Sequence, residues 1–177
     1  MPRTNKVSKE EILAIAKRML LDKDGEAFSM RNIAKECSIS VGTIYNYYPD
    51  KDTLMEEIMI QDWNAALQKM SEVSETASGF VEGLSGIIDA MRGFIMIYRH
   101  IWMKHGNVPG TFQLRDVYHN RLVQEVSGSV RRLLERFGTE RDISLDTIFT
   151  ESILSSVTRN NINTADILHL AEYITKH

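Results

Sequence analysis

Apolar residues recur through most of this chain at spacings of three and four, which is the spacing of one buried face of an α-helix. No segment alternates apolar and polar residues in the way a half-buried strand does. The pattern therefore predicts an all-α fold. The expected helices cover approximately residues 9–21, 30–37, 41–48, 51–71, 80–104, 112–137, 144–158 and 164–176.

Capping residues mark several of the expected helix ends. Ser8 and Glu11 have the spacing of a capping box at the start of the first helix, and Asp50 can cap the fourth. The polar stretch Ser71–Gly79 predicts the frayed end of the fourth helix and a connection. Glycine costs about 1 kcal/mol in a helix interior, so the Ser-Gly-Ser run at residues 127–129 predicts a break in the sixth helix.

The stretch from Ser29 to Leu54 predicts two short helices joined by a tight turn. Ser29 and Ser40 are good N-caps for the two helices. Pro49 ends the second, because proline lacks an amide proton and disfavours helix in the residue before it. The second helix carries side chains suited to a DNA major groove, namely Thr43, Tyr45, Asn46 and Tyr47. This is the arrangement of a helix-turn-helix, which indicates gene regulation rather than catalysis.

Charge is divided unevenly along the chain, whose net charge is −3. Residues 1–51 hold nine Lys and Arg against seven Asp and Glu, a balance of +2. Residues 52–177 hold twelve against seventeen, a balance of −5. Phosphate binding depends on local basic charge, so this division agrees with an N-terminal DNA reader attached to an acidic body.

Composition excludes several other classes of protein. The hydrophobic fraction of 43% is ample for a core, yet no uncharged apolar run approaches the roughly 20 residues of a membrane span. The first residues lack the apolar stretch of a secretory signal, and Cys37 is the only cysteine, so no internal disulfide is possible. We therefore expect a cytoplasmic protein that makes no membrane contact, with Cys37 as a small buried hydrophobic residue rather than a redox sensor.

The sequence lacks the motifs of catalysis and metal binding. His100 and His105 are five residues apart, whereas two metal ligands on one helical face need a spacing of three or four. No nucleophile elbow, phosphate loop or dinucleotide-binding glycine pattern occurs. We expect neither an enzyme nor a bound metal or cofactor.

Residues 25–54 resemble the TetR family of bacterial transcription regulators, the tetracycline-repressor type. The matching pattern is G-x-x-x-S-M-R-x-I-A-x-x-x-x-x-S-x-G-T-[IL]-Y-x-Y-[FY]-P-x-K-x-x-L. One departure is Ser38, at a turn position where most members have glycine, and serine can adopt this turn at some cost. The resemblance implies a DNA-binding domain at residues 1–51 and a helical regulatory and dimerisation domain at residues 52–177.

The resemblance also implies a homodimer that binds a near-palindromic operator in double-stranded DNA. The helices at residues 144–158 and 164–176 would pair with those of the second subunit as a four-helix bundle. A small apolar or amphipathic inducer would favour a conformation in which the separation of the two reading helices does not match the half-site spacing of the operator. A repressor would then be released from the DNA. Two alternatives stay open: a co-regulator of this fold that acts through protein contacts without DNA recognition, and a regulator that senses a protein partner or nothing at all.

Individual residues receive roles from the motif and from their chemistry. Tyr45 and Lys51 match the family's phosphate contacts, the alternatives being a core aromatic and a solvated lysine. Asn46 can pair with adenine, or contact phosphate or solvent. Thr4 and Lys6 would form a minor-groove arm or a disordered tail. The expected DNA contacts are Ser29, Arg31, Val41, Gly42, Thr43, Tyr45, Asn46, Tyr47 and Lys51.

Two sets of apolar residues have different expected roles. Ile33, Ala34, Ile39 and Ile44 are expected to pack the helix-turn-helix together. In the second domain, an apolar inducer pocket could be lined by Met91, Phe94, Ile95, Tyr98, Trp102 and Phe112, with Arg92, Arg99 or His100 orienting a polar group of the ligand. At helical spacing, these six apolar residues also fit an ordinary helical core.

Overall fold

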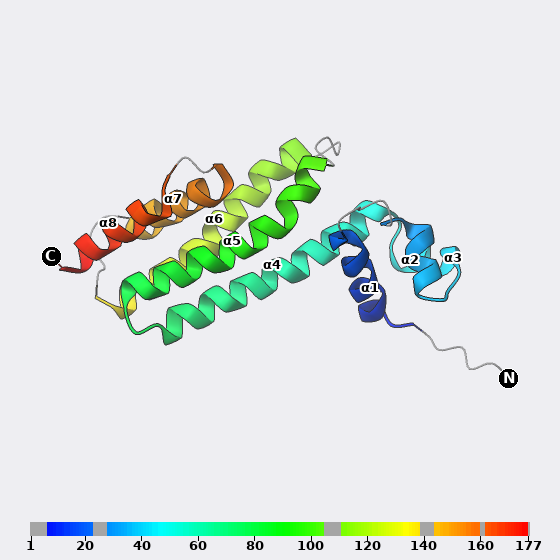
Figure 1. Cartoon of the computed structure of the whole chain (residues 1–177), viewed down its shortest axis with the longest axis horizontal. Coiled ribbons are helices and arrows are strands. Elements are labelled where there is room, and N and C mark those ends of the chain that lie inside the picture. The colour runs from blue at the N-terminus through cyan, green and yellow to red at the C-terminus, as the bar shows by residue number, and fades with distance from the viewer. Residues whose placement is uncertain (1–6, 23–27, 105–110, 139–143, 160–161, 177) are drawn as a thin grey trace. The chain divides into compact units, whose positions relative to one another are not determined.

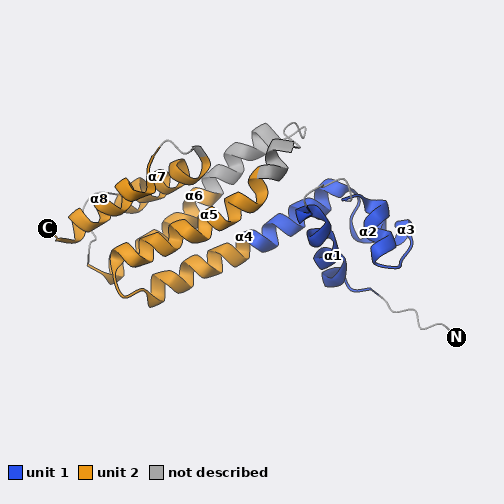
Figure 2. Cartoon of the chain, in the orientation of Figure 1, with its two compact units in different colours: residues 1–63 blue, residues 64–177 orange. Residues whose placement is uncertain are grey.

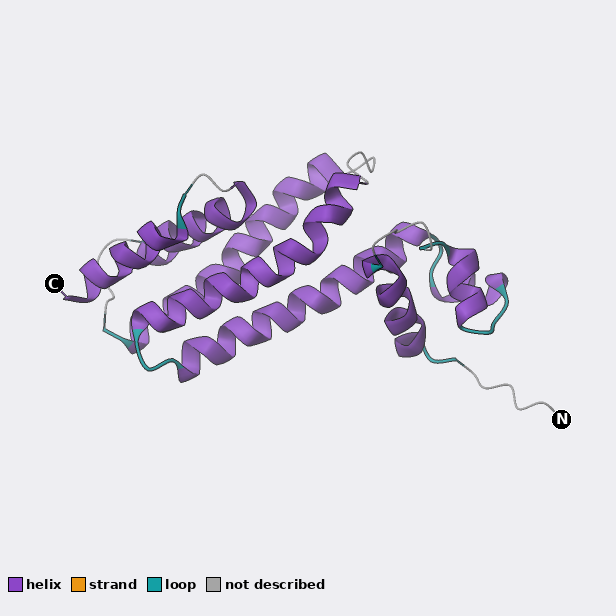
Figure 3. Ribbon diagram, in the orientation of Figure 1, coloured by secondary structure: helices purple, strands orange, loops and turns teal. Residues whose placement is uncertain are grey.

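The computed structural model describes residues 7–22, 28–104, 111–138, 144–159 and 162–176, except for the side chains of residues 100–121 and 159. Within these ranges the chain forms α-helices and no strand, which confirms the predicted all-α fold (Figure 3). The helices are α1 (Lys9–Leu21), α2 (Met30–Glu36), α3 (Val41–Tyr47), α4 (Lys51–Thr76), α5 (Phe80–Lys104), α6 (Thr111–Arg136), α7 (Leu145–Arg159) and α8 (Thr164–Lys176) (Figure 1).

Most helices begin and end close to their predicted bounds, because the expected capping residues are used. Ser8 Oγ accepts a hydrogen bond from the backbone N–H of Glu11 at 3.1 Å, and a Glu11 carboxylate oxygen accepts one from the N–H of Ser8 at 2.9 Å. At the start of α4, Asp50 Oδ1 accepts a hydrogen bond from the N–H of Thr53 at 2.7 Å. This hydrogen bond lowers the pKa of the Asp50 carboxyl.

The predicted end of α4 at Ser71 is wrong, since the helix continues through Thr76. Residues of α6 hold these last turns. Ser74 Oγ donates to the carbonyl of Ser129 at 3.1 Å, and Arg136 Nη1 donates to the carbonyl of Ser74 at 3.0 Å. Residues 71–76 of the polar stretch are therefore helical and pack against a neighbour, and residues 77–79 alone form the predicted connection to α5.

The predicted break in α6 is also wrong, since the helix passes through Gly128 without interruption. Val126 and Val130, which flank the glycine, are fully buried. Burying a valine side chain is worth about 1.5 kcal/mol or more, so the packing of these two residues outweighs the cost of about 1 kcal/mol for one glycine.

The chain divides into two compact units, residues 1–63 and residues 64–177 (Figure 2). The division lies inside α4, and the domain boundary expected after Lys51 stays a prediction. The part of the chain that the structure describes holds no helix that is both long and apolar enough to cross a membrane.

The first unit consists of α1, α2, α3 and the start of α4. Two ion pairs join α1 to α4, one between Lys9 Nζ and Glu57 Oε1 at 2.8 Å and one between Lys17 and Asp62. The core of this unit is made of side chains that are at most 1% exposed, namely Ile12, Ala16, Ile33, Ala34, Ile44, Tyr48, Leu54 and Ile58.

The second unit is built around α5, which packs against α6, α7 and α8. The buried residues of α5 recur at helical spacing, as in Leu84, Ile87 and Met91. The rings of Phe80 on α5 and Phe149 on α7 meet edge to face, with their centres 5.5 Å apart. α5 thus contacts all three of the helices that, like itself, lie wholly in the second unit.

Candidate nucleic-acid interface

The helices α2 and α3 form the predicted helix-turn-helix, and each begins at its predicted N-cap. Ser29 Oγ accepts a hydrogen bond from the N–H of Asn32 at 3.2 Å, and Ser40 Oγ accepts one from the N–H of Thr43 at 3.1 Å. Ser40 and Thr43 also join through their hydroxyl oxygens at 2.8 Å. The start of the candidate reading helix is therefore fixed by a cap that also holds the Thr43 side chain.

The turn between α2 and α3 has the hydrogen bonds of a Schellman motif. The N–H of Ile39 donates to the carbonyl of Ala34, and the N–H of Ser38 donates to the carbonyl of Lys35, each at 3.0 Å. Ser38 has a φ of 55°, in the left-handed region that favours glycine. The position where the motif usually has glycine therefore carries backbone strain in this chain.

Apolar residues of the motif hold the two helices together, as predicted. Ile33, Ala34 and Ile44 are fully buried, whereas Ile39 in the turn is half-buried. Cys37 is 6% exposed, and burial, assisted by nearby carboxylates, raises the pKa of its thiol. A raised pKa leaves little reactive thiolate, which agrees with a small buried hydrophobic residue.

The opposite face of α3 is exposed and carries most of the residues expected to contact bases. Gly42 and Asn46 are exposed, Val41 is 37% exposed, and Thr43 is half-buried. Tyr45 is 50% exposed, so it is not a core aromatic. A Cβ at Gly42 would meet only a Ser40 oxygen at 3.7 Å, so the fold itself does not require glycine there.

Two further tyrosines end α3 and have different surroundings. Tyr47 is half-buried, and its hydroxyl donates to the carbonyl of Val7 at 3.2 Å. Tyr48 is 1% exposed, and its hydroxyl lacks a hydrogen-bond partner in the described part of the chain. Burial raises the pKa of the Tyr48 phenol far above its usual range, and the Glu57 carboxylate adds to this effect.

Lys51 lies beside the start of α2, where two other expected DNA contacts, Ser29 and Arg31, are found. Its Nζ is 5.0 Å from the centre of the ring of Phe28, the residue that precedes Ser29. Arg31 is exposed in the first turn of α2. The structure thus places Lys51 beside the segment that carries Ser29 and Arg31, and all three side chains can donate hydrogen bonds to a phosphate.

Four of the residues predicted to line an inducer pocket are buried in the second unit: Met91, Phe94, Ile95 and Tyr98. The rings of Phe94 and Tyr98 are 5.0 Å apart between centres and tilted by 44°. The side chains of Trp102, Phe112 and His100 lie outside the described residues. Burial at this level fits the helical core, and a pocket at these residues stays a prediction.

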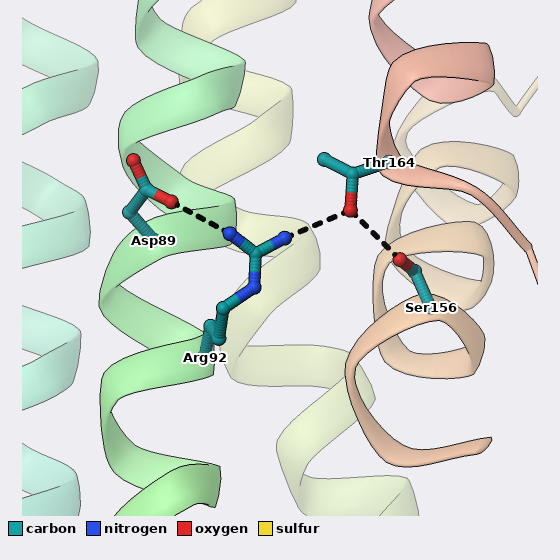
Figure 4. A network of polar contacts seen from close by, with 4 residues as sticks. All are labelled: Asp89, Arg92, Ser156 and Thr164. Carbon is teal, nitrogen blue, oxygen red and sulfur yellow. Dashed lines mark hydrogen bonds and ion pairs between the residues drawn. The ribbon is translucent and has the colours of Figure 1, made fainter. Parts of the chain in front are cut away.

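The guanidinium of Arg92, a candidate for orienting a ligand, is bound by protein groups (Figure 4). Its Nη1 donates to Asp89 Oδ1 at 3.1 Å, and its Nη2 donates to Thr164 Oγ1 at 2.8 Å. Thr164 Oγ1 in turn lies 3.0 Å from Ser156 Oγ. Arg92 therefore connects α5 with α7 and α8, whereas Arg99 on the same helix is exposed.

Residues 12–58 match the family described as bacterial regulatory proteins, tetR family. The N-terminal unit belongs to the TetR family. The HTH-type transcriptional regulator UidR of Escherichia coli (strain K12) is 32% identical over 68 residues, which are 38% of this chain and 35% of UidR. The match thus spans about a third of the length of this curated relative.

Solved structures of transcription regulators share the fold of the whole chain. A regulator from Cytophaga hutchinsonii ATCC 33406 aligns with a TM-score of 0.64 and 15% identity, covering 94% of this chain and 92% of its own. AibR, solved in complex with isovaleryl coenzyme A and operator DNA, aligns with a TM-score of 0.54 and 18% identity, covering 94% of this chain and 95% of its own. These likenesses establish the fold, while the TetR-family match covers the DNA-binding unit.

The sequence analysis did not predict two features of the TetR-family unit, the contact between Tyr47 and Val7 and the burial of Tyr48. Tyr47 and Val7 are 40 residues apart, and nothing in the motif indicates that the tyrosine hydroxyl meets this carbonyl. The burial of Tyr48, however, could have been predicted from its spacing in the sequence. Tyr48 follows Ile44 by four residues, and this spacing places both on one helical face.

Proposed function

We propose that this chain is a DNA-binding transcription regulator of the TetR type that inserts α3 into the major groove of an operator. The division of α3 into two faces carries this proposal. Ile44 is fully buried where α3 packs against α2, whereas Val41, Tyr45 and Asn46 are exposed on the other side. The exposed residues are therefore those whose chemistry can read or hold DNA.

Phosphate contacts would come from both sides of the turn. Tyr45 can donate its phenol O–H, and Lys51 can supply a point charge beside the start of α2. Ser29 and Arg31 would add a backbone amide and a guanidinium from the first turn of α2. These contacts would hold α3 in register without reading sequence.

Base contacts would come from the first turns of α3. Asn46 can pair with the N6 and N7 edge of adenine, and the methyl group of Thr43 can touch a thymine methyl. Gly42 would let the backbone approach the groove, because it has no side chain to stand between the backbone and the DNA. Val41 and Tyr47 are the remaining proposed contacts on this helix.

A second copy of the chain would pair along α7 and α8. Large apolar side chains are exposed on these helices, with Ile148 at 44%, Leu170 at 42% and Tyr173 at 64%. Leu170 and Tyr173 are three residues apart on α8 and share a face. A homodimer would cover this face and place two copies of α3 on the half-sites of a near-palindromic operator.

Release from the operator would follow the binding of a small apolar or amphipathic inducer in the second unit. The aromatic and aliphatic side chains of Met91, Phe94, Ile95 and Tyr98 are the proposed lining, with Trp102 and Phe112. AibR, which shares this fold, supports this part of the proposal, because it was solved with both isovaleryl coenzyme A and operator DNA. A ligand that favours a dimer whose two α3 helices do not match the half-site spacing of the operator would shift the population away from the DNA-bound form.

The test begins with capture of fragments of the native genome by the purified protein, followed by gel shifts at several salt concentrations. Lys51→Ala should weaken binding to every fragment and lower the salt slope by about one. Asn46→Ala should change the preferred site and leave the slope intact. Lys69→Ala is the matched control, because it removes the same charge from an exposed position of the second unit.

Two results would contradict the proposal. Wild-type protein that captures no fragment in a salt-dependent way would favour the co-regulator that acts through protein contacts. Equal losses on every sequence for Lys51→Ala and Asn46→Ala would refute the division into phosphate and base contacts.

A further inference from the structure

The side chains of Ser40 and Thr43 are joined at the start of α3. Ser40 Oγ accepts a hydrogen bond from the backbone N–H of Thr43 at 3.1 Å, and it also lies 2.8 Å from Thr43 Oγ1. A helix cap requires only the first of these contacts, the one to the backbone N–H. The Ser40 side chain therefore does more than cap α3, because it also holds the hydroxyl of Thr43.

This contact decides which rotamer Thr43 adopts. In a helix a threonine side chain divides between two χ1 rotamers, because its hydroxyl can also bond to the carbonyl three or four residues before it. The 2.8 Å contact selects the rotamer that places Oγ1 beside Ser40. The hydroxyl and the methyl group occupy different staggered positions about the Cα–Cβ bond, so the position of the methyl group is fixed as well.

Thr43 shares a face of α3 with a second residue that is proposed to read bases. Asn46 follows Thr43 by three residues, a spacing that places both side chains on one side of the helix, and Asn46 is exposed. Because Ser40 holds the hydroxyl, the apolar methyl group is the part of Thr43 left to meet a base. In the major groove, an apolar contact recognises the C5 methyl group of thymine, which cytosine lacks.

We propose that Ser40 is a positioning residue, which holds the Thr43 hydroxyl at the start of α3 so that Thr43 reads the C5 methyl group of one thymine in each half-site. This inference rests on the proposed DNA-binding function and adds how that function selects a base. A free threonine hydroxyl can donate or accept and so pair with any base edge. Its contact with Ser40 removes this ambiguity and leaves a contact that distinguishes thymine from cytosine.

Paired DNA duplexes test the assignment. The shortest captured operator fragment that binds is synthesised with each thymine replaced in turn by deoxyuridine, which lacks only the C5 methyl group. At one thymine in each half-site, the replacement should lower wild-type affinity about fourfold, the value of one buried methyl group. Thr43→Ser should abolish this ratio, because it removes the methyl group and keeps the hydroxyl. Thr43→Val should keep the ratio, because it keeps the methyl group and removes the hydroxyl.

Ser40→Gly separates positioning from capping, since glycine is an accepted N-cap that lacks the hydroxyl. Thr43 would then divide between two rotamers, one of which presents the methyl group, so the ratio should fall to about two- to threefold. On the Thr43→Val background, Ser40→Gly should leave the ratio unchanged, because no hydroxyl remains to be held. Ser40→Thr, which keeps a hydroxyl, should retain the wild-type ratio.

Ser29→Gly is the matched control, because it makes the same substitution at the N-cap of α2. It should weaken binding to both duplexes of a pair equally and leave their ratio unchanged. Direct competition between the two duplexes measures each ratio, and thermal unfolding followed by circular dichroism checks that each variant is folded.

Three outcomes would overturn the assignment while leaving the proposed function intact. If no single deoxyuridine lowers the affinity, no thymine methyl group is read. If Thr43→Ser keeps the ratio or Thr43→Val abolishes it, Thr43 does not read through its methyl group. If Ser40→Gly keeps the full ratio, Ser40 only caps α3. Wild-type protein without salt-dependent DNA binding would instead refute the proposed function, and this inference with it.

Discussion

Replacing Ser38 with glycine should stabilise the DNA-binding unit. Ser38 lies in the turn between α2 and α3 with a φ of 55°. In this left-handed region, Cβ crowds the following carbonyl oxygen, at a cost of about 1–2 kcal/mol for an L-residue. Ser38→Gly removes that cost and keeps the backbone hydrogen bonds of the turn, from Ser38 to Lys35 and from Ile39 to Ala34, since these do not use the side chain.

The net gain is smaller than the strain that is removed. Glycine loses more backbone freedom on folding than serine does, which costs about 0.5–1 kcal/mol. Taken at the middle of each range, about 1.5 and about 0.75 kcal/mol, the two terms give an expected rise of about 0.7 kcal/mol in the free energy of unfolding. DNA affinity should stay unchanged, because the Schellman hydrogen bonds that set the turn remain.

Urea unfolding followed by circular dichroism measures this change as a shift of the midpoint at constant slope. Gly138→Ser is the mirror control. Gly138 has a φ of 64°, and nothing lies within 4 Å of an added Cβ, so serine there should lower the free energy of unfolding by a similar amount. If Gly138→Ser destabilises as expected while Ser38→Gly also destabilises, the Ser38 side chain supports the turn and the strain is not the dominant effect.

Two further predictions concern the second unit. A Cβ at Gly86 would lie 2.6 Å from Cγ1 of Val73, a stiff β-branched side chain, so Gly86→Ala should be less stable by about 1–3 kcal/mol than Gly93→Ala. A Cβ at Gly93 would have nothing within 4 Å, and the replacement of Gly93 by alanine should stabilise the fold by about 1 kcal/mol. Equal urea midpoints for the two variants would contradict the close approach of Val73 to Gly86. For Asp146, burial opposes ionisation, but hydrogen bonds from Arg131 at 2.6 and 3.1 Å outweigh it and lower the pKa of the carboxyl. A lowered pKa stabilises the folded state at pH values above the usual aspartate pKa of about 3.9. This stabilisation is lost as the pH falls from that value through the lowered pKa of the folded state. Asp146→Asn should therefore be less stable than the wild type at pH 7, by about 1 kcal/mol in urea unfolding, and this difference should shrink as the pH falls and Asp146 becomes protonated in the folded state; a difference that does not change with pH would show that the carboxylate charge is not responsible.

Local signals in the sequence were enough to predict most helix ends. The start of α1 follows from Ser8 and Glu11, which lie three residues apart and satisfy each other's backbone donors. The end of α4 could not be predicted in this way. Its last turns are held by Ser74 and Ser129, which are 55 residues apart, so the decisive contact is tertiary. Gly128 shows the same limit, because the burial of its neighbours, and not its own preference, decides that α6 continues.

The three tyrosines at the end of α3 show how far residue type alone can assign a site. Tyr45 is half-exposed, Tyr47 donates to Val7, and Tyr48 is buried. The helical spacing from Ile44 separates Tyr48 from Tyr45 without a structure. The role of Tyr47 could not be predicted, because its partner lies on a segment whose approach depends on how α1 packs in the folded unit.

The shortness of α3 ties DNA reading to the stability of the first unit. A helix of seven residues is far below the roughly 12–15 needed for stability alone in water, so α3 exists through its Ser40 cap and the burial of Ile44. A substitution at Ile44 would therefore lower DNA affinity only by unfolding the unit. A substitution at Asn46 would lower affinity while the unit stays folded, because that side chain is exposed. Measuring the free energy of unfolding beside the affinity for each variant consequently separates residues that build the reading helix from residues that read.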